Sequence, residues 1–399
     1  MNNSVRYHGL DALRAFAMIM GVVIHSSMFY VKGIGEGLGY ELTGRIMIPT
    51  SDTLGVIFFF IHTWRMPVFF LLAGFFARLM IQKRGVISLS KNRFLRIVVP
   101  LAVCALVYNL VFQFGSIQEL HHLWFLRDLV WMYALIIFIK WVRMPVSGRV
   151  WKGSVTGKLD RIFASGASIW WMMIWLIPAT VIGRPLFFNL INPNNGSPGP
   201  FFVLGFSYFL IGWFMHRNPG ILSILSSRWK IYVSLGLIVF GTLMLILTRL
   251  EKIDTADSGL EDGLFWILGI ALSSLSMFLI IMGFIGASEA MFRKSNSFIS
   301  YFVDASYWIY LLHLVVVFAI GAAILESTNL HPLIGVSVNI SLTTVICVVT
   351  YHICVRYTPV GWVLHGRKGM FTDLFIPLVG KSIPQTNTSG HDSGSNKRE

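Results

Sequence analysis

The sequence predicts an all-α fold, a polytopic transmembrane helical bundle of about ten spans with both termini in the cytoplasm. Composition, recurring apolar segments and the distribution of basic residues support this prediction. Of the 399 residues, 55% are hydrophobic and only 13% are charged, whereas about 25% of the residues of a soluble globular chain are charged. The apolar runs recur along the whole chain, which indicates a membrane protein rather than a soluble protein with an anchor.

A membrane-spanning helix needs about 20 mainly apolar residues. This length rule predicts spans near residues 13–31, 54–80, 95–114, 123–142, 167–188, 200–215, 231–249, 263–285, 298–325 and 333–355. Pro67 lies inside the second span, where neighbouring helices can satisfy the backbone group that it leaves without a partner. We therefore predict one membrane domain over residues 1–380, followed by a polar, disordered cytoplasmic tail over 381–399.

Basic residues define the predicted orientation. The 32 Lys and Arg residues outnumber the 18 Asp and Glu residues, and they concentrate in alternate loops such as 83–96, 140–161 and 217–230. The intervening loops are poor in Lys and Arg, and the loop over 250–262 is acidic. Loops rich in Lys and Arg stay in the cytoplasm, which places both termini there and agrees with an even number of spans.

Other function classes lack the residues they need. The basic residues form no aromatic-interleaved patch, so no nucleic-acid partner is predicted. Cys104, Cys347 and Cys354 lie in apolar stretches without metal-ligand spacing, so neither a disulfide framework nor a metal site is expected. There is also no P-loop, GxSxG elbow or HExxH helix in a usable context. Any chemistry must therefore come from His and Arg, with no bound cofactor.

Two of the predicted spans contain both His and Arg. Arg14 opens the first span, and His25 follows eleven residues later, about 16 Å along a helix at 1.5 Å per residue. His62 and Arg65 lie one turn apart in the second span and share a face. An ionisable side chain at mid-helix costs roughly 2.5–3.5 kcal/mol on insertion. Such residues therefore indicate a functional site.

Further polar residues are expected at a similar depth. The outer loop before the fourth span contains HHLWFLRD, with His122 and Trp124, and the ninth span contains Tyr310 and His313 one turn apart. We hypothesise that these histidines line one polar chamber in the outer half of the bundle together with His25, His62 and Arg65.

Each of these residues also has a purely structural interpretation. An intramembrane His such as His313 can be an interhelical hydrogen-bond partner, and Arg65 can pair with Asp52. Arg14 can serve with Asp11 as an anchor at the membrane interface, and Trp124 can belong to the aromatic belt. Arg93 and Arg96 can be basic residues that only set the orientation in the membrane.

Four stretches resemble the acyltransferase 3 family of integral membrane acyltransferases. They are GLDALRAFAMIMGVVIH with Arg14 and His25, MPVFFLLAGFFA, NRFLRIVVPL with Arg93 and Arg96, and SYWIYLLHLVV with Tyr307, Tyr310 and His313. Each stretch alone is a weak signal, but all four occur in order along nearly the whole chain. The FIHTWRMPVFF and HHLWFL stretches look closest to the subgroup that includes the succinyltransferase of osmoregulated periplasmic glucans.

The resemblance implies transfer of an acyl group, acetyl or succinyl, from a cytoplasmic acyl-CoA-type donor to a carbohydrate or periplasmic glycan hydroxyl. It implies a multi-pass protein of the bacterial inner membrane, with a separate polymer-synthesis partner as one possibility. Arg93 and Arg96 would hold donor phosphates, and His25 would act as base or acyl carrier. Arg65 or His62 would stabilise the oxyanion, and Trp124 would face a sugar ring.

Two rival hypotheses use the same residues. A transporter of a sugar or lipid would use the buried His and Arg side chains as a substrate or proton path. It should show a matched pair of broken helices, and only Pro67 suggests one. A structural subunit of a surface-polymer assembly would use these side chains as interhelical contacts. Donor-dependent acyl transfer without net transport would distinguish an enzyme from both.

Overall fold

The computed structural model describes residues 7–44, 49–112, 121–146, 176, 178–180, 202–250, 260–294 and 296–365. All regular elements in these ranges are helical, which confirms the all-α prediction. The predicted span over 167–188 lies outside the described residues except for four of its positions, and the predicted tail over 381–399 lies wholly outside them.

The first half of the chain forms five longer helices and short turns between them. They are α1 (His8–Ser27), η1 (Met28–Tyr30), α2 (Ile34–Thr43), α3 (Asp52–Arg93), the π-helical turn η2 (Phe94–Val98), α4 (Val99–Phe112), η3 (His121–Leu123) and α5 (Trp124–Val146). The second half consists of α8 (Phe202–Met215), α9 (Gly220–Leu250), α10 (Leu260–Met291), α11 (Ser297–Ser327), α12 (Pro332–Thr350), the π-helical turn η5 (Tyr351–Val355) and α13 (Pro359–His365).

Six helical segments among the described residues are long and apolar enough to cross a membrane: His8–Tyr30, Asp52–Leu110, Gly220–Arg249, Ile267–Met291, Ser297–Ser327 and Pro332–Val355. The protein is therefore a multi-pass membrane protein, but the expected count of ten spans is not confirmed. Two predicted spans merge into Asp52–Leu110, and α8 has only 14 residues. Helix α5 contains Arg127, Asp128 and Lys140 within its first 17 residues, which lowers its hydropathy. The sides on which the termini lie remain a prediction.

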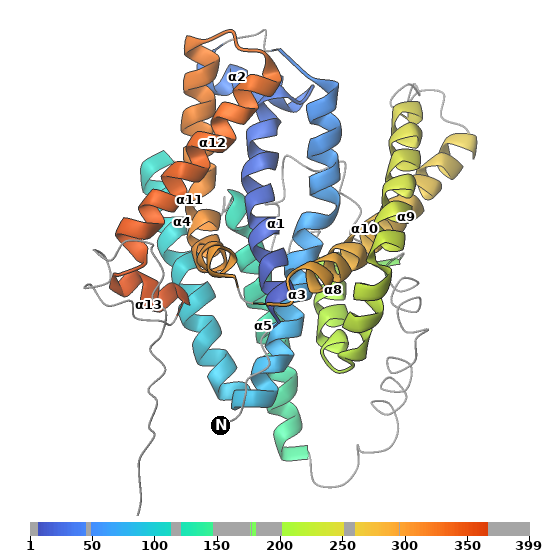
Figure 1. Cartoon of the computed structure of the whole chain (residues 1–399), viewed down its shortest axis with the longest axis vertical. Coiled ribbons are helices and arrows are strands. Elements are labelled where there is room, and N and C mark those ends of the chain that lie inside the picture. The colour runs from blue at the N-terminus through green and yellow to red at the C-terminus, as the bar shows by residue number, and fades with distance from the viewer. Residues whose placement is uncertain are drawn as a thin grey trace, which may run out of the picture.

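Helix α3 is broken at Gly85, beyond the second predicted span, and not at Pro67. Helix α3 continues through Pro67, and the non-helical backbone inside it is at Gly85, with φ 79° and ψ 172°. A positive φ is accessible to glycine at little cost because it has no Cβ. The chain therefore turns at this point, so that η2 packs against α3 and α4 runs back in the opposite direction (Figure 1).

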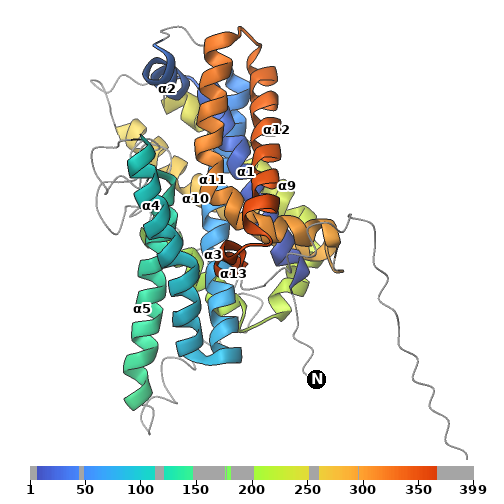
Figure 2. The same ribbon diagram turned by 90° about the vertical axis from the view of Figure 1, so that its left-hand side faces the viewer.

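Helix α1 lies in the middle of the bundle and packs against α3, α10, α11 and α12. Figure 2 shows α11 and α12 side by side. On the other side, α3 and α8 approach closely enough that a Cβ at Gly74 would collide with the Phe209 carbonyl group and one at Gly212 with that of Leu71. Small residues permit such backbone contact between membrane helices, and it fixes α3 against its neighbours.

Candidate active site

Three histidines from three different helices meet inside the bundle. The ring centroid of His313 on α11 lies 5.3 Å from that of His25 on α1 and 5.6 Å from that of His122 in η3. His313 is 1% exposed and His122 8% exposed, whereas His25 keeps more of its surface accessible. We call His25, His122 and His313 the histidine cluster.

The hydrogen bonds of His313 determine its tautomer. Its Nδ1 lies 2.9 Å from the carbonyl oxygens of both Ile309 and Tyr310. Because carbonyl oxygens only accept, Nδ1 carries the proton and donates it. Nε2 then has a lone pair, and this buried atom has no hydrogen-bond partner among the described residues. His313 therefore presents a proton acceptor to the interior.

His25 has a similar arrangement one helix away. Its Nδ1 lies 3.2 Å from the Met28 sulfur on the following turn. A thioether sulfur is a weak acceptor, so this contact favours the tautomer with the proton on Nδ1 and the lone pair on Nε2. Nδ1 of His313 is thus occupied within α11 and Nδ1 of His25 by Met28 of η1, which leaves Nε2 of each histidine to face a substrate.

Arg65 introduces a buried positive charge beside the histidine cluster. It is 5% exposed, and its charge acts on His25, His313 and Tyr310. Its guanidinium group packs over Gly21, one turn before His25, where a Cβ would lie 3.3 Å from Cζ. The Nε atom is buried without a hydrogen-bond partner among the described residues. A buried cation with a donor to spare can stabilise a negative charge that develops nearby.

The proposed pairing of Arg65 with Asp52 is wrong. Both residues lie on the continuous part of α3, thirteen positions apart, which corresponds to about 20 Å along the helix. His62, by contrast, lies one turn from Arg65 and acts electrostatically on His25. Its ring stacks on that of Phe58 with centroids 6.0 Å apart.

Tyrosines on α11 extend from the histidine cluster toward the end of the bundle where α1 begins. The Tyr310 hydroxyl donates to the His122 carbonyl oxygen at 2.7 Å, and the Tyr307 hydroxyl donates to the Arg96 carbonyl oxygen at 2.6 Å. The two rings are nearly parallel, with centroids 6.3 Å apart. Because Tyr307 and His313 are separated by six residues, the two levels are about 9 Å apart along the helix.

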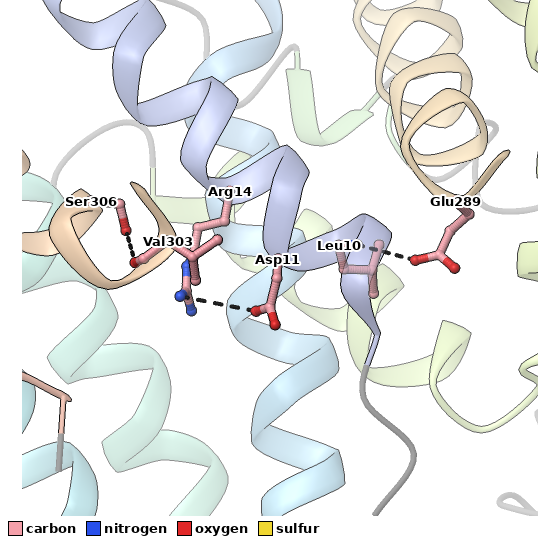
Figure 3. Close-up of polar contacts among 6 residues, drawn as sticks. All are labelled: Leu10, Asp11, Arg14, Glu289, Val303 and Ser306. Carbon is pink, nitrogen blue, oxygen red and sulfur yellow. Dashed lines mark hydrogen bonds and ion pairs between the residues drawn. The ribbon is translucent and has the colours of Figure 1, made fainter. Parts of the chain in front are cut away.

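Arginines gather at this second level. The charges of Arg14, Arg84 and Arg93 all act on Arg96, and the Arg93 guanidinium lies over the Tyr133 ring at 4.7 Å. We call Arg14, Arg84, Arg93 and Arg96 the arginine cluster. Arg14 also forms a 4.0 Å ion pair with Asp11, and its side chain points toward the turn of α11 that contains Val303 and Ser306 (Figure 3).

The structure thus divides the predicted site residues between two levels. The first level contains His25, His62, Arg65, His122, Tyr310 and His313, and the second contains Arg14, Arg93 and Arg96. That the first group lines a polar chamber stays a prediction. Trp124 packs beside Phe70, with ring centroids 6.4 Å apart. No group of three His, Cys, Asp or Glu side chains in the described ranges has an arrangement that could hold a metal ion.

Sequence reasoning missed Tyr108 and Gly21. The Tyr108 hydroxyl donates to the Leu311 carbonyl oxygen, and its ring centroid lies 5.4 Å from that of His122. Neither residue stands out in the sequence, because a tyrosine or a glycine in an apolar span is ordinary. Only the packing of α1 and α4 against their neighbours reveals that they shape the site.

Comparison with known proteins identifies the family. The family model for an acyltransferase domain, acyltransferase 3, matches residues 7–355, which include both levels of the site. The chain belongs to the acyltransferase 3 family. It is therefore a membrane acyltransferase, as the four resembling stretches predicted.

The similar curated relatives are glucan biosynthesis proteins. Glucans biosynthesis protein C of Escherichia coli (strain K12) is 24% identical over 392 residues, which cover 91% of this chain and 95% of the relative. The protein of the same name from Shigella dysenteriae serotype 1 is 23% identical over 394 residues, with the same two coverages. No solved structure matches this chain.

Proposed function

We propose that this acyltransferase moves an acetyl or succinyl group from a cytoplasmic acyl-CoA donor to a hydroxyl group of a carbohydrate, such as a periplasmic glycan. The observation that carries the proposal is the meeting of His25, His122 and His313 beside the buried cation Arg65. The printed name of the relatives, glucans biosynthesis protein C, supports a glycan acceptor.

The arginine cluster is the proposed site for the donor phosphates. Arginine matches phosphate oxygens through bidentate, charge-assisted hydrogen bonds, and Arg93 and Arg96 lie one turn apart with Arg14 and Arg84 nearby. The donor's extended arm would then follow the tyrosines of α11 for about 9 Å to the histidine cluster. The thioester would then lie beside Arg65.

In the direct version of the reaction, Nε2 of His25 or His313 removes the proton from the acceptor hydroxyl. The resulting oxygen attacks the thioester carbonyl carbon, and Arg65 stabilises the oxyanion, where one donor is typically worth about 2.7–4 kcal/mol. Collapse of this intermediate breaks the C–S bond. The leaving thiolate takes the proton from the imidazolium, which yields the ester and the free thiol of coenzyme A.

In the two-step version, Nε2 itself attacks the thioester and forms an acyl-imidazole, with release of the coenzyme A thiol. The acceptor hydroxyl then attacks this intermediate and restores the histidine. With a lone pair on Nε2 of both His25 and His313, one histidine would carry the acyl group while the other takes the acceptor proton.

The test is acyl transfer by the purified protein in liposomes, with labelled acetyl-CoA or succinyl-CoA and periplasmic glycans. We expect labelled glycan from the native chain and a loss of about 10²-fold or more in His25→Ala. His331→Asn is the matched control, because His331 caps α12 through its ring nitrogen and Asn retains a cap. Full activity in folded variants of both His25 and His313 would overturn the proposed mechanism, and active uptake of glycan without transfer would favour a transporter.

A further inference from the structure

A second group of cations surrounds one tryptophan, away from the histidine cluster. The Cζ atom of Arg78 on α3 lies 5.5 Å from the centroid of the Trp213 ring on α8, and Nζ of Lys140 on α5 lies 5.8 Å from it. His216 and Arg217 follow directly after α8. We call Arg78, Lys140, Trp213, His216 and Arg217 the Trp213 cluster; three separate helices therefore contribute to it.

The charges in this cluster repel one another. Arg217 acts on Arg78, and both Arg78 and Lys83 act on His216. Burial lowers the pKa of His216, and the two neighbouring cations lower it further. A group of like charges is stabilised when an anion lies among them, and arginine is the residue best suited to phosphate.

Two members of the cluster, His216 and Arg78, are held within the fold, whereas Arg217 is exposed. His216 is 9% exposed, and its ring makes an edge contact with Phe75 at 4.8 Å. Its Nδ1 atom and the Nε atom of Arg78 are buried without a hydrogen-bond partner in the described part of the chain. Two polar atoms held in place in this way are ready to bind a ligand.

The surroundings of the cluster favour a lipid over a soluble anion. Trp141 follows Lys140 directly on α5, and it is 68% exposed. This exposed aromatic ring can contact an acyl chain while the cations contact a headgroup. The cluster also lies at the end of the bundle where α1 begins, because Tyr7 contacts both Phe75 and His216 (Figure 1). This end is the predicted cytoplasmic side, where anionic lipids attract basic residues.

We propose that the Trp213 cluster binds the headgroup phosphate of an anionic phospholipid, with an acyl chain beside the exposed Trp141 of α5. This lipid site is distinct from the arginine cluster, in which Arg93 and Arg96 are proposed to hold the donor. It does not depend on the acyltransferase mechanism. A bound lipid would hold the ends of α3, α5 and α8 together.

The test is native mass spectrometry of the full-length protein in detergent, titrated separately with phosphatidylglycerol, phosphatidylcholine, inorganic phosphate and coenzyme A. We expect selective retention of phosphatidylglycerol. Each cation near a headgroup contributes about fivefold in affinity, so Lys140→Gln should weaken retention about fivefold and the double variant Arg78→Gln/Lys140→Gln about 30-fold. Elution volume and circular dichroism would establish that the variants fold, and Lys140→Gln supplies the test if the double variant does not.

Lys230→Gln is the matched control. Lys230 Nζ also lies 5.8 Å from a tryptophan ring, that of Trp229 on α9, but outside the Trp213 cluster. This variant should retain the lipid as the native chain does. Equal retention of phosphatidylcholine, unchanged lipid binding in a folded Lys140→Gln variant, or an equal loss in Lys230→Gln would each overturn the proposal. Displacement of the lipid by equimolar inorganic phosphate or coenzyme A would also overturn it, because the site would then belong to a soluble anion.

Discussion

Gly21 lies against the Arg65 guanidinium. The substitution Gly21→Ala should therefore lower the rate of acyl transfer without lowering the stability of the protein. The new Cβ would lie 3.3 Å from both Cζ and Nη1 of Arg65 and 3.4 Å from Nη2. Such contacts are tighter than ordinary van der Waals distances, so the guanidinium must move by a few tenths of an ångström. The helix itself should gain about 0.5–1 kcal/mol, because glycine is unfavourable inside a helix.

The expected loss of activity follows from the demands on an oxyanion donor. Complete loss of one such donor costs about 10²–10³ in kcat, and a misplacement of about 1 Å can cost 10²-fold. A smaller displacement should therefore lower kcat roughly tenfold. The measurements are the initial rate of labelled acyl transfer in liposomes and the thermal midpoint by tryptophan fluorescence.

Gly241→Ala is the control for this substitution. Gly241 is also inside a helix, α9, but a Cβ there would meet no atom within 4 Å. The Gly241→Ala variant should gain the same helix stability and keep the native rate of acyl transfer. An unchanged rate in Gly21→Ala, with the thermal midpoint equal to or above that of the native chain, would refute the placement of Arg65 at the reacting carbonyl.

Three other substitutions test separate parts of the structure. Gly212→Val should destabilise the protein by about 1–3 kcal/mol or more, measured by thermal unfolding, because its side chain would collide with the Leu71 carbonyl group; a native midpoint would contradict the close packing of α3 and α8. Tyr307→Phe removes the 2.6 Å hydrogen bond to the Arg96 carbonyl oxygen, worth about 1 kcal/mol, and should raise KM for the donor more than it lowers kcat; a change confined to kcat would count against a role in donor binding. The pKa of His216 is lowered from 6.5 in the fold, so its stabilising contribution is present above pH 6.5 and is lost as pH falls below that value. His216→Phe should therefore lose less stability than the native chain when unfolding is compared at about pH 7 and pH 5, and identical pH dependence would refute this.

Hydropathy alone located most of the helices. The predicted spans over 200–215 and 298–325 correspond to α8 (Phe202–Met215) and α11 (Ser297–Ser327) within two residues at each end. Agreement is close because a helix in lipid must satisfy its backbone internally and must be apolar over its length. The second span was harder to delimit, because α3 continues past the apolar stretch as far as Gly85 and beyond.

The site was predicted in composition but not in geometry. His25, His62, Arg65 and His313 were selected because an ionisable side chain in lipid is costly and so indicates a function. Their meeting depends on which helices touch, and periodicity within one helix carries no such information. The eleven-residue spacing predicted that Arg14 and His25 lie far apart along one helix, but only the structure shows that Arg14 lies near Arg96.

The sequence by itself determined that this chain is a helical membrane protein of the acyltransferase 3 family, with histidine and arginine as its chemical groups. Those properties depend on local hydropathy and on the order of short motifs, and both can be read directly from the sequence. Only the tertiary structure decided that three histidines lie close together, that Arg65 packs against Gly21, and that a second set of cations surrounds Trp213. These features arise from contacts between helices distant in sequence, where the close approach of small residues and the burial of charge select one arrangement.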